Sequence, residues 1–244
     1  MTTPSLNDPG VTVGDIVAAD YRAAAVFERH DIDFCCGGAT TLAAACASRR
    51  VDAATLVREL EEVTSRPAPD DQDYATWNLT RLIDHIRDVH HVYVRENVAQ
   101  NAVYSRKIAD VHGDHHAELV RIAAEVESMA AALMKHLEEE EQVVFPAIKR
   151  AEAASQAGRP IAPEDAEIVA RGLESLTRDH EEVGAALHAI RDMAMGYALP
   201  PDACATYALT YQRLRAFEAD LHKHVHLENN VLFPGAEELT APVG

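Results

Sequence analysis

The chain has 244 residues, of which 48% are hydrophobic and 25% are charged, so it is long enough to bury a sizeable core. Aromatic residues make up only 5%, and this scarcity of strand-forming side chains favours an all-helical protein. The formal net charge of −18 argues against nucleic acid as a partner, because neutralising phosphates requires clustered Lys and Arg.

The sequence carries no sign of export or of membrane insertion. No uninterrupted apolar run approaches the roughly 18 residues that a membrane span needs. Residues 1–10 lack a basic region followed by an apolar stretch, which a signal peptide would show. The four cysteines include one adjacent pair and make a poor disulfide framework. We therefore expect a cytoplasmic protein with no membrane partner.

The first helical pattern begins near the N-terminus. Apolar residues recur at steps of three and four from Val13 to Phe27, which is the spacing of an amphipathic helix. The pattern stops at Asp33–Gly38, whose sequence DFCCGG ends in two glycines. We therefore predict a helix followed by a turn that carries two adjacent cysteines.

Two further short helices are predicted before the first linker. Thr40 or Thr41 can cap the second helix, and Asp52 can cap the third. The stretch 64–71 that follows is polar and contains prolines, so we interpret it as a linker. The sequence thus predicts a small three-helix domain within residues 1–65.

Four long helical patterns follow the linker. Glycines and prolines interrupt the apolar periodicity between them, and the intervening loops are short. Long helices joined by short loops predict an antiparallel four-helix bundle, which we place in residues 74–244. The four patterns run from Trp77 to Val111, from Asp114 to Arg150, from Pro163 to Ala194 and from Asp202 to Glu238.

The predicted bundle contains an internal repeat. Residues 136–146 align with residues 224–234, and in both copies a His is followed by Glu at +4, Phe at +9 and Pro at +10. A further His lies 45 residues before the first copy and 44 residues before the second. Such a duplication suits a pseudo-symmetric bundle with one central site. The nominated residues are His136 with Glu140, His224 with Glu228, and the upstream His91 and His180.

The spacing of four within each copy favours metal binding. Residues four apart on an α-helix lie about 40° apart around its axis, so both side chains can reach one point inside the bundle. Residues at other spacings from the His point to other sides of the helix. The acidic run of the first copy is therefore expected to form mostly a solvated face. The residues predicted to point away from the site are Glu138, Glu139 and Glu141 in the first copy and His222 and His226 in the second.

The donor atoms of the repeat suit a transition metal. Several imidazoles with two carboxylates form a ligand set for Fe, Mn or Zn rather than for Ca or Mg. Two carboxylates that reach the centre can bridge a pair of metals, as in di-iron bundles. A single His-x-x-x-Glu more often forms a surface ion pair, but two matched copies favour a metal. The familiar signature of carboxylate bundles is Glu-x-x-His, whereas here the order is His-x-x-x-Glu and histidines dominate. This pattern points to a hemerythrin-like site.

These residues, together with others, resemble the iron–sulfur cluster repair di-iron family, also called the RIC, ScdA or YtfE proteins. The resemblance covers nearly the whole chain and implies a hemerythrin-like four-helix bundle after a small leading domain. The Cys-Cys-Gly-Gly motif and the last block are its most specific parts. The matching stretches are Asp33–Gly38, Leu82–Ile86, His90–His91, Val111–Gly113, His136–Pro146, His180–Glu181, Ala203–Cys204 and Leu227–Pro234.

The resemblance implies a centre of two non-haem Fe ions. His112, which the repeat does not nominate, lies 21 residues after His91, so one straight helix would separate them by about 31 Å. For both to bind one metal pair the chain must turn back, and Asn97–Asn101 is a place for that turn. His90 competes with His91 for the same role. The implied ligands are His91, His112, His136, His180 and His224, with Glu140 and Glu228 as bridges.

The four cysteines fall into two classes. Cys35 and Cys36 lie in a glycine-flanked turn, where two thiols could bind iron, react with nitric oxide or form a transient disulfide. The simpler interpretation is a buried pair, since free Cys is often buried. The family resemblance implies that Cys35 and Cys36 are catalytic. Cys46 and Cys204 lie in Ala-rich helical stretches, so we expect both to be structural.

The resemblance implies repair of iron–sulfur clusters damaged by nitrosative or oxidative stress, with damaged iron–sulfur proteins and nitric oxide or O2 as partners. The centre would donate iron or reduce nitric oxide, which leaves a nitric oxide reductase activity open. The alternative is a hemerythrin-like sensor or carrier of O2 or nitric oxide, and a third hypothesis is iron storage or a scaffold. Client proteins, the electron donor and a homodimeric state stay open.

Overall fold

The structure is a computed structural model that describes residues 4–6, 8–65 and 74–241. Within these residues the chain is helical, apart from one isolated bridge between Thr12 and Thr41. It divides into a terminal unit (Met1–Ile83 with Lys223–Gly244) and a bundle unit (Asp84–His222). The all-α class expected from the composition is confirmed.

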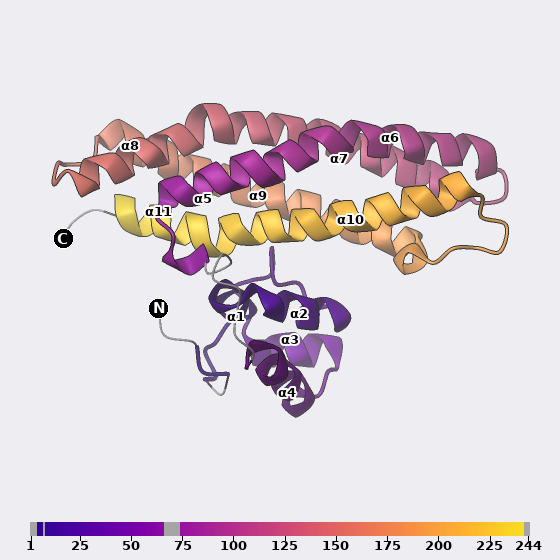
Figure 1. Cartoon of the computed structure of the whole chain (residues 1–244), viewed down its shortest axis with the longest axis horizontal. Helices are drawn as coiled ribbons and strands as arrows, with labels where there is room; N and C mark the ends of the chain where they lie inside the picture. Colours follow the sequence, from indigo (N-terminus) through magenta and orange to yellow (C-terminus); the bar gives the residue numbers. More distant parts are fainter. Residues whose placement is uncertain (1–3, 7, 66–73, 242–244) are drawn as a thin grey trace. The chain divides into compact units, whose positions relative to one another are not determined.

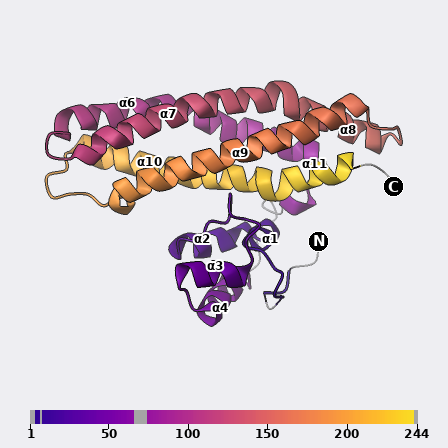
Figure 2. The same ribbon diagram turned by 180° about the vertical axis from the view of Figure 1, so that it is seen from behind.

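Four long helices build the bundle unit: α6 (Val92–His112), α7 (Ala117–Glu139), α9 (Pro163–Met193) and α10 (Ala205–Leu227), the last up to His222. Figures 1 and 2 show them running lengthwise beside one another, with connections at opposite ends, so neighbours in sequence are antiparallel. This is the four-helix bundle that the sequence predicts. Three shorter helices lie in line with them: α5 (Leu79–His85), α8 (Phe145–Gln156) and α11 (Phe233–Thr240).

The inward face of α7 shows how the bundle forms. Its buried apolar side chains recur at steps of three and four, which places them on one stripe of the helix. The same cluster takes in apolar residues from α6, α9 and α10, so all four helices share one core. The stripe of α7 consists of Leu119, Ile122, Val126, Met129 and Leu133.

Three long helices are each interrupted by a wider, π-helical turn that the sequence pattern does not predict. These turns are η3 (Ile86–His91), η4 (Glu140–Val144) and η6 (Glu228–Leu232). Pro146 and Pro234 follow η4 and η6 and have no N–H for a bond to the residue four before, while their rings crowd that carbonyl. The repeated Phe-Pro therefore gives a cause for widening both helices just after the repeated Glu.

Four short helices form the described part of the terminal unit before the linker: α1 (Val13–Ala19), α2 (Ala24–Arg29), α3 (Leu42–Arg49) and α4 (Ala53–Thr64). The predicted caps are present, since the side chains of Thr41 and Asp52 accept hydrogen bonds from the backbone N–H groups of Ala44 and Thr55. The predicted linker lies outside the described residues from 66 onward.

The first predicted helix is corrected by the structure. Asp20 is extended, with φ −154°, and separates α1 from a short 3-10 turn at Tyr21–Ala23 that leads into α2. The Asp20 carboxylate accepts a hydrogen bond from the backbone N–H of Arg22 at 3.0 Å. A local cap that competes with the helix thus overrides the apolar periodicity.

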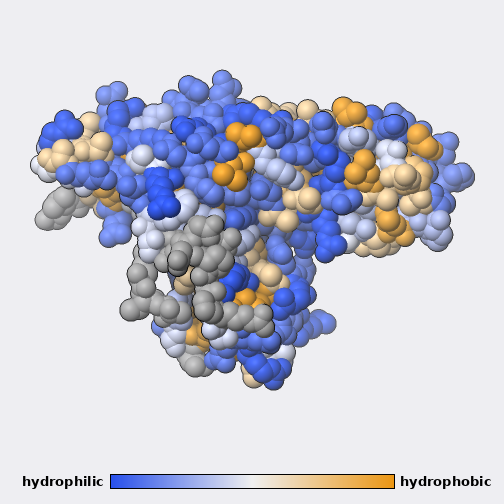
Figure 3. Space-filling view, in the orientation of Figure 1, coloured by the Kyte–Doolittle hydropathy of each residue, from blue (hydrophilic) through white to orange (hydrophobic). Residues whose placement is uncertain are grey.

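The visible surface of the protein is mainly hydrophilic. In the view of Figure 3, hydrophilic residues cover most of the bundle, and hydrophobic ones form small scattered groups. Among the described residues, no helix is both long and apolar enough to cross a membrane.

Candidate metal centre

Each copy of the repeat brings its His and Glu together. Glu140 and Glu228 stand at the start of the π turns η4 and η6, and both are 0% exposed. The His136 Nε2 lies 3.4 Å from Glu140 Oε1, and the His224 Nε2 lies 3.0 Å from Glu228 Oε1. The spacing of four therefore places both donor pairs inside the protein, as the sequence predicts.

The two upstream histidines complete the set. The His91 Nε2, in η3, lies 3.3 Å from Glu140 Oε2. The His180 Nε2, on α9, lies 3.0 Å from the His136 Nε2. Two imidazole lone pairs facing each other at this distance repel, so the arrangement suits a proton or a cation held between them.

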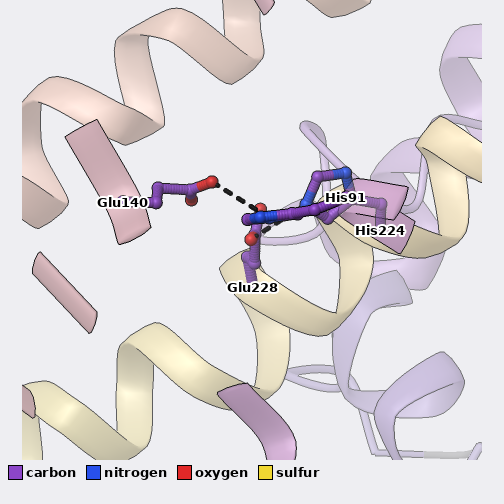
Figure 4. A group of neighbouring side chains, drawn as sticks. All are labelled: His91, Glu140, His224 and Glu228. Carbon is purple, nitrogen blue, oxygen red and sulfur yellow. Dashed lines mark hydrogen bonds and ion pairs between the residues drawn. The ribbon is translucent and has the colours of Figure 1, made fainter. Parts of the chain in front are cut away.

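The six side chains form two overlapping groups of four. Within each group, one ligand atom of every residue lies within 4.8 Å of the others. Figure 4 shows the first group, in which the Glu140 carboxylate and the His224–Glu228 pair point toward one another. Both glutamates occur in both groups, which is the arrangement of carboxylates that bridge two cations. The groups are His91, Glu140, His224 and Glu228, and His136, Glu140, His180 and Glu228.

The donor set fits a pair of transition-metal ions. Two acidic groups and four imidazoles are all buried, so a carboxylate pair without a cation would face a large desolvation cost. Nitrogen donors outnumber carboxylates, which favours Fe, Mn or Zn over Ca or Mg. The chemistry of this cluster therefore matches what the repeat predicts.

Carboxylates outside the cluster orient two of the imidazoles. The His91 Nδ1 lies 2.7 Å from Glu141 Oε1, and the His136 Nδ1 lies 3.2 Å from Asp179 Oδ2. A hydrogen bond at Nδ1 leaves the Nε2 lone pair directed at the cluster, which is how such partners tune metal-binding histidines. Burial alone would raise the pKa of Glu141, but hydrogen bonds from Arg95 and His91 outweigh it and lower that pKa.

Sequence reasoning missed this role of Glu141. It lies next to Glu140 and lacks the spacing of four, so it was expected on a solvated face. In the structure its carboxylate is 18% exposed and points along the helix surface to His91 and Arg95. Glu141 therefore faces away from the cluster, as predicted, but it is not simply solvated.

The structure distinguishes His91 from its neighbour. The His90 Nδ1 lies 3.0 Å from Asp220 Oδ1, and His90 belongs to neither group of four. Only His91 of this pair joins the cluster. Both rings are buried, so burial alone could not have decided between them.

His112 is not brought to the cluster. The expected reversal at Asn97–Asn101 does not occur, because α6 runs unbroken from Val92 to His112. One straight helix separates His91 and His112 by about 31 Å, and the His112 Nε2 instead lies 3.3 Å from the Cys204 Sγ. The resemblance placed His112 among the ligands by position alone, whereas the continuity of the helix excludes it from this cluster.

His226 turns away from the cluster, as predicted, but it is not a surface residue. Its ring is 1% exposed and packs against Phe34 and Tyr21, with centroids 5.9 and 5.6 Å apart. Burial lowers the pKa of His226 to about 3, so the ring is neutral. His222, 8% exposed, likewise lies outside both groups of four.

The adjacent cysteines form a compact group with Asp33. Asp33 Oδ1 accepts hydrogen bonds from the backbone N–H groups of Cys35 and Cys36, both at 3.0 Å, and lies 3.3 Å from the Cys35 Sγ. The two sulfurs are 3.9 Å apart, and no disulfide joins them. A hydrogen bond with Cys36, together with burial, raises the pKa of the Cys35 thiol well above its ordinary value.

The backbone of the cysteine motif is held by the second copy of the repeat. The Asn230 Nδ2 lies 3.3 Å from the Phe34 carbonyl oxygen and 3.4 Å from that of Cys35. A Cβ on Gly38 would lie 2.2 Å from Asn230 Oδ1, so only a glycine leaves room for this amide. The first copy has Gln142 at the equivalent position. The second copy of the repeat thus contributes His224 and Glu228 to the candidate metal centre. Its Asn230 also holds the backbone of the cysteine motif.

Gly38→Ala should lower the free energy of unfolding of the terminal unit by about 1–3 kcal/mol, because the new methyl group overpacks the contact with Asn230. Urea unfolding followed by Trp77 fluorescence measures this loss, since Trp77 is the single tryptophan and lies in that unit. Gly10→Ala is the control, as its Cβ would meet nothing closer than 3.4 Å. An equal loss of unfolding free energy from both substitutions would contradict this role of the contact between Gly38 and Asn230.

Two family models match the chain. The model described as the hemerythrin HHE cation binding domain matches residues 81–236, which include all six residues of the cluster. The ScdA_N model, described as a domain of unknown function, matches residues 10–64 and so includes Cys35 and Cys36.

Curated relatives extend the similarity over nearly the whole chain. Proteins from Citrobacter koseri, Escherichia coli O17:K52:H18 and Escherichia fergusonii are each 32% identical to it over 224 residues. The aligned part is 92% of this chain and 95% of each relative, and all three are named iron–sulfur cluster repair protein YtfE. With its buried His/Glu cluster and its leading cysteine motif, the chain belongs to the hemerythrin HHE family and, within it, to the ScdA/YtfE group of iron–sulfur cluster repair proteins.

Proposed function

We propose that the protein binds two Fe ions in the cluster and repairs iron–sulfur clusters damaged by nitrosative or oxidative stress. The observation that supports this most directly is the pair of overlapping four-residue groups that share Glu140 and Glu228. The function comes from the relatives, whose names state iron–sulfur cluster repair. Damaged iron–sulfur proteins would be its clients, and a cytoplasmic location is part of the proposal.

Different residues would have different roles in binding iron. When bound, the iron supplies an exchangeable metal for donation and electrons for the reduction of nitric oxide. His91 and His136 are held by Glu141 and Asp179, so their Nε2 atoms are positioned before a metal arrives. Glu140 and Glu228 would hold the ions through carboxylates, which can bind one metal ion or two and so would suit a site that must release an ion.

The cysteine motif is proposed to supply the thiols of the reaction. The raised pKa of Cys35 keeps its side chain protonated at neutral pH, so Cys35 is present as a thiol and not as a thiolate. Cys36 is only half-buried and lies 3.9 Å away. Cys36 is therefore the sulfur of this pair that a client can reach first.

Anaerobically purified protein should contain iron and restore activity to a cluster enzyme previously damaged by nitric oxide. The double substitution Cys35→Ser with Cys36→Ser should reduce that repair several-fold while leaving the iron content unchanged, because neither sulfur belongs to the His/Glu cluster. Cys46→Ser is the matched control, since it removes a buried thiol from the same unit. Loss of iron in the double variant would show that the thiols have been assigned wrongly.

A sensor or carrier of O2 or nitric oxide is the second candidate, because the hemerythrin match by itself specifies only cation binding. The two functions differ in turnover. A sensor would take up nitric oxide in a fixed ratio to protein without consuming it, and the double cysteine variant would behave like the wild type. Consumption of nitric oxide beyond that ratio, or iron transfer to a damaged cluster, supports repair.

A further inference from the structure

Cys204 lies in a different environment from the other cysteines. Its Ala-rich surroundings in the sequence predict a structural role, but its side chain is exposed. It immediately precedes α10, which begins at Ala205, and its carbonyl accepts a hydrogen bond from the backbone N–H of Ala208 at 3.0 Å. Cys204 therefore caps the N-terminus of a 23-residue helix.

Several groups that favour negative charge converge on its sulfur. The His112 Nε2, at the end of α6, lies 3.3 Å from the Cys204 Sγ. The N-terminus of a helix also carries partial positive charge. A thiolate at this position is thus stabilised from two independent sides.

The His112 ring is packed in place by its neighbours. It lies against Tyr207, with centroids 5.5 Å apart, and near His116 at 6.4 Å. The His116 Nε2 is in turn 3.1 Å from the Asp202 carboxylate, and its Nδ1 is 3.1 Å from Glu118. A nucleophile paired with a positioned imidazole is the usual arrangement of an activated thiol.

This arrangement is not a second metal site. Among the residues that the structure describes, no third His, Cys, Asp or Glu offers a ligand atom within 4.8 Å of both Cys204 and His112. Two donors are fewer than a structural transition-metal site requires. The pair is therefore suited to thiol chemistry.

We propose that Cys204 is a reactive thiol at which the protein forms reversible mixed disulfides with small disulfides. The Cys204 thiolate attacks one sulfur of the disulfide, the original S–S bond breaks, and the second sulfur leaves as a thiolate. The small disulfide is the oxidant, so no other co-reactant is needed. Reduction by a free thiol reverses the step.

The other thiols are less suited to this reaction. The hydrogen bond from His112, together with the backbone N–H groups at the start of α10, lowers the pKa of Cys204 to about 7, so the thiolate is well populated at neutral pH. Burial raises the pKa of Cys46, and the pKa of the buried Cys35 is raised further. Cys204 should therefore react first.

The test uses the full chain and 5,5′-dithiobis(2-nitrobenzoate), a small aromatic disulfide whose released thiolate is coloured. One fast equivalent is expected, located on Cys204 by peptide mass spectrometry, with a pH midpoint near 7. Cys204→Ser should abolish this fast phase. His112→Gln should move the midpoint toward about 8.5, the value of a free cysteine, and slow the reaction several-fold at pH 6.5.

His115→Gln is the matched control, because His115 is a nearby exposed histidine outside the pair. It should leave the midpoint and the rate unchanged. The iron content of Cys204→Ser should equal that of the wild type, which separates this result from a failure of the metal centre. A fast equivalent on Cys36, or a midpoint that is the same in His112→Gln, would overturn the proposal.

Discussion

Glu140→Ala and Glu228→Ala should each lower the metal content from about two ions per chain to one or none. Each carboxylate belongs to both four-residue groups, so under the proposed binding of two ions each substitution would remove a ligand from both at once. It would also leave two cations close together in a buried site without the negative charge that offsets their repulsion. Repair activity should be lost with the metal.

Glu139→Ala is the matched control for these substitutions. Glu139 is the residue before Glu140 on the same helix, but its side chain points about 100° away and belongs to neither group. Metal analysis of anaerobically purified protein measures the outcome, and the rise in melting temperature on adding Fe(II) provides a second readout. If Glu139→Ala loses metal as readily as Glu140→Ala, the argument from helical register fails.

His226→Ala should lower the free energy of unfolding of the terminal unit by about 3 kcal/mol while leaving the metal content unchanged. The ring fills a fully buried position against Phe34 and Tyr21, so truncation leaves a cavity. It also removes one of the hydrogen-bonding partners of Asn230, whose Nδ2 lies 3.1 Å from His226 Nδ1.

His224→Ala, two residues away, should have the opposite result. It should lose metal, because His224 belongs to the cluster, whereas His226→Ala should keep it. Urea unfolding followed by Trp77 fluorescence, in parallel with metal analysis, separates the two effects. If His226→Ala loses as much metal as His224→Ala, the assignment of His224 to the cluster and of His226 to the core of the terminal unit is wrong.

The sequence predicts much of this site because helical periodicity is strict. The spacing of four between His136 and Glu140, repeated at His224 and Glu228, identified four of the six clustered residues. The nearly equal distances to the upstream histidines, 45 and 44 residues, identified His91 and His180. The caps at Thr41 and Asp52 were also predictable, since capping depends on a few neighbouring residues.

Other features depend on backbone crowding or on contacts between distant parts of the chain, and an apolar pattern does not predict them. The crowding caused by Pro146 gives a cause for the π turn at Glu140–Val144 that an apolar pattern does not reveal. The burial of His226 depends on Phe34, almost two hundred residues earlier, and the exposure of Cys204 depends on where its helix begins. His112 was misplaced because similarity was given more weight than the length of an unbroken helix.

The terminal unit joins the two ends of the chain, and this has a consequence for biosynthesis. Its core contains Phe34 and Val225, and Asn230 reaches the carbonyl of Cys35 across 195 positions of sequence. A ribosome delivers Phe34 and Cys35 well before Val225 and Asn230, which follow almost two hundred residues later. The core around the two thiols can therefore close only after the bundle residues between these segments have been made.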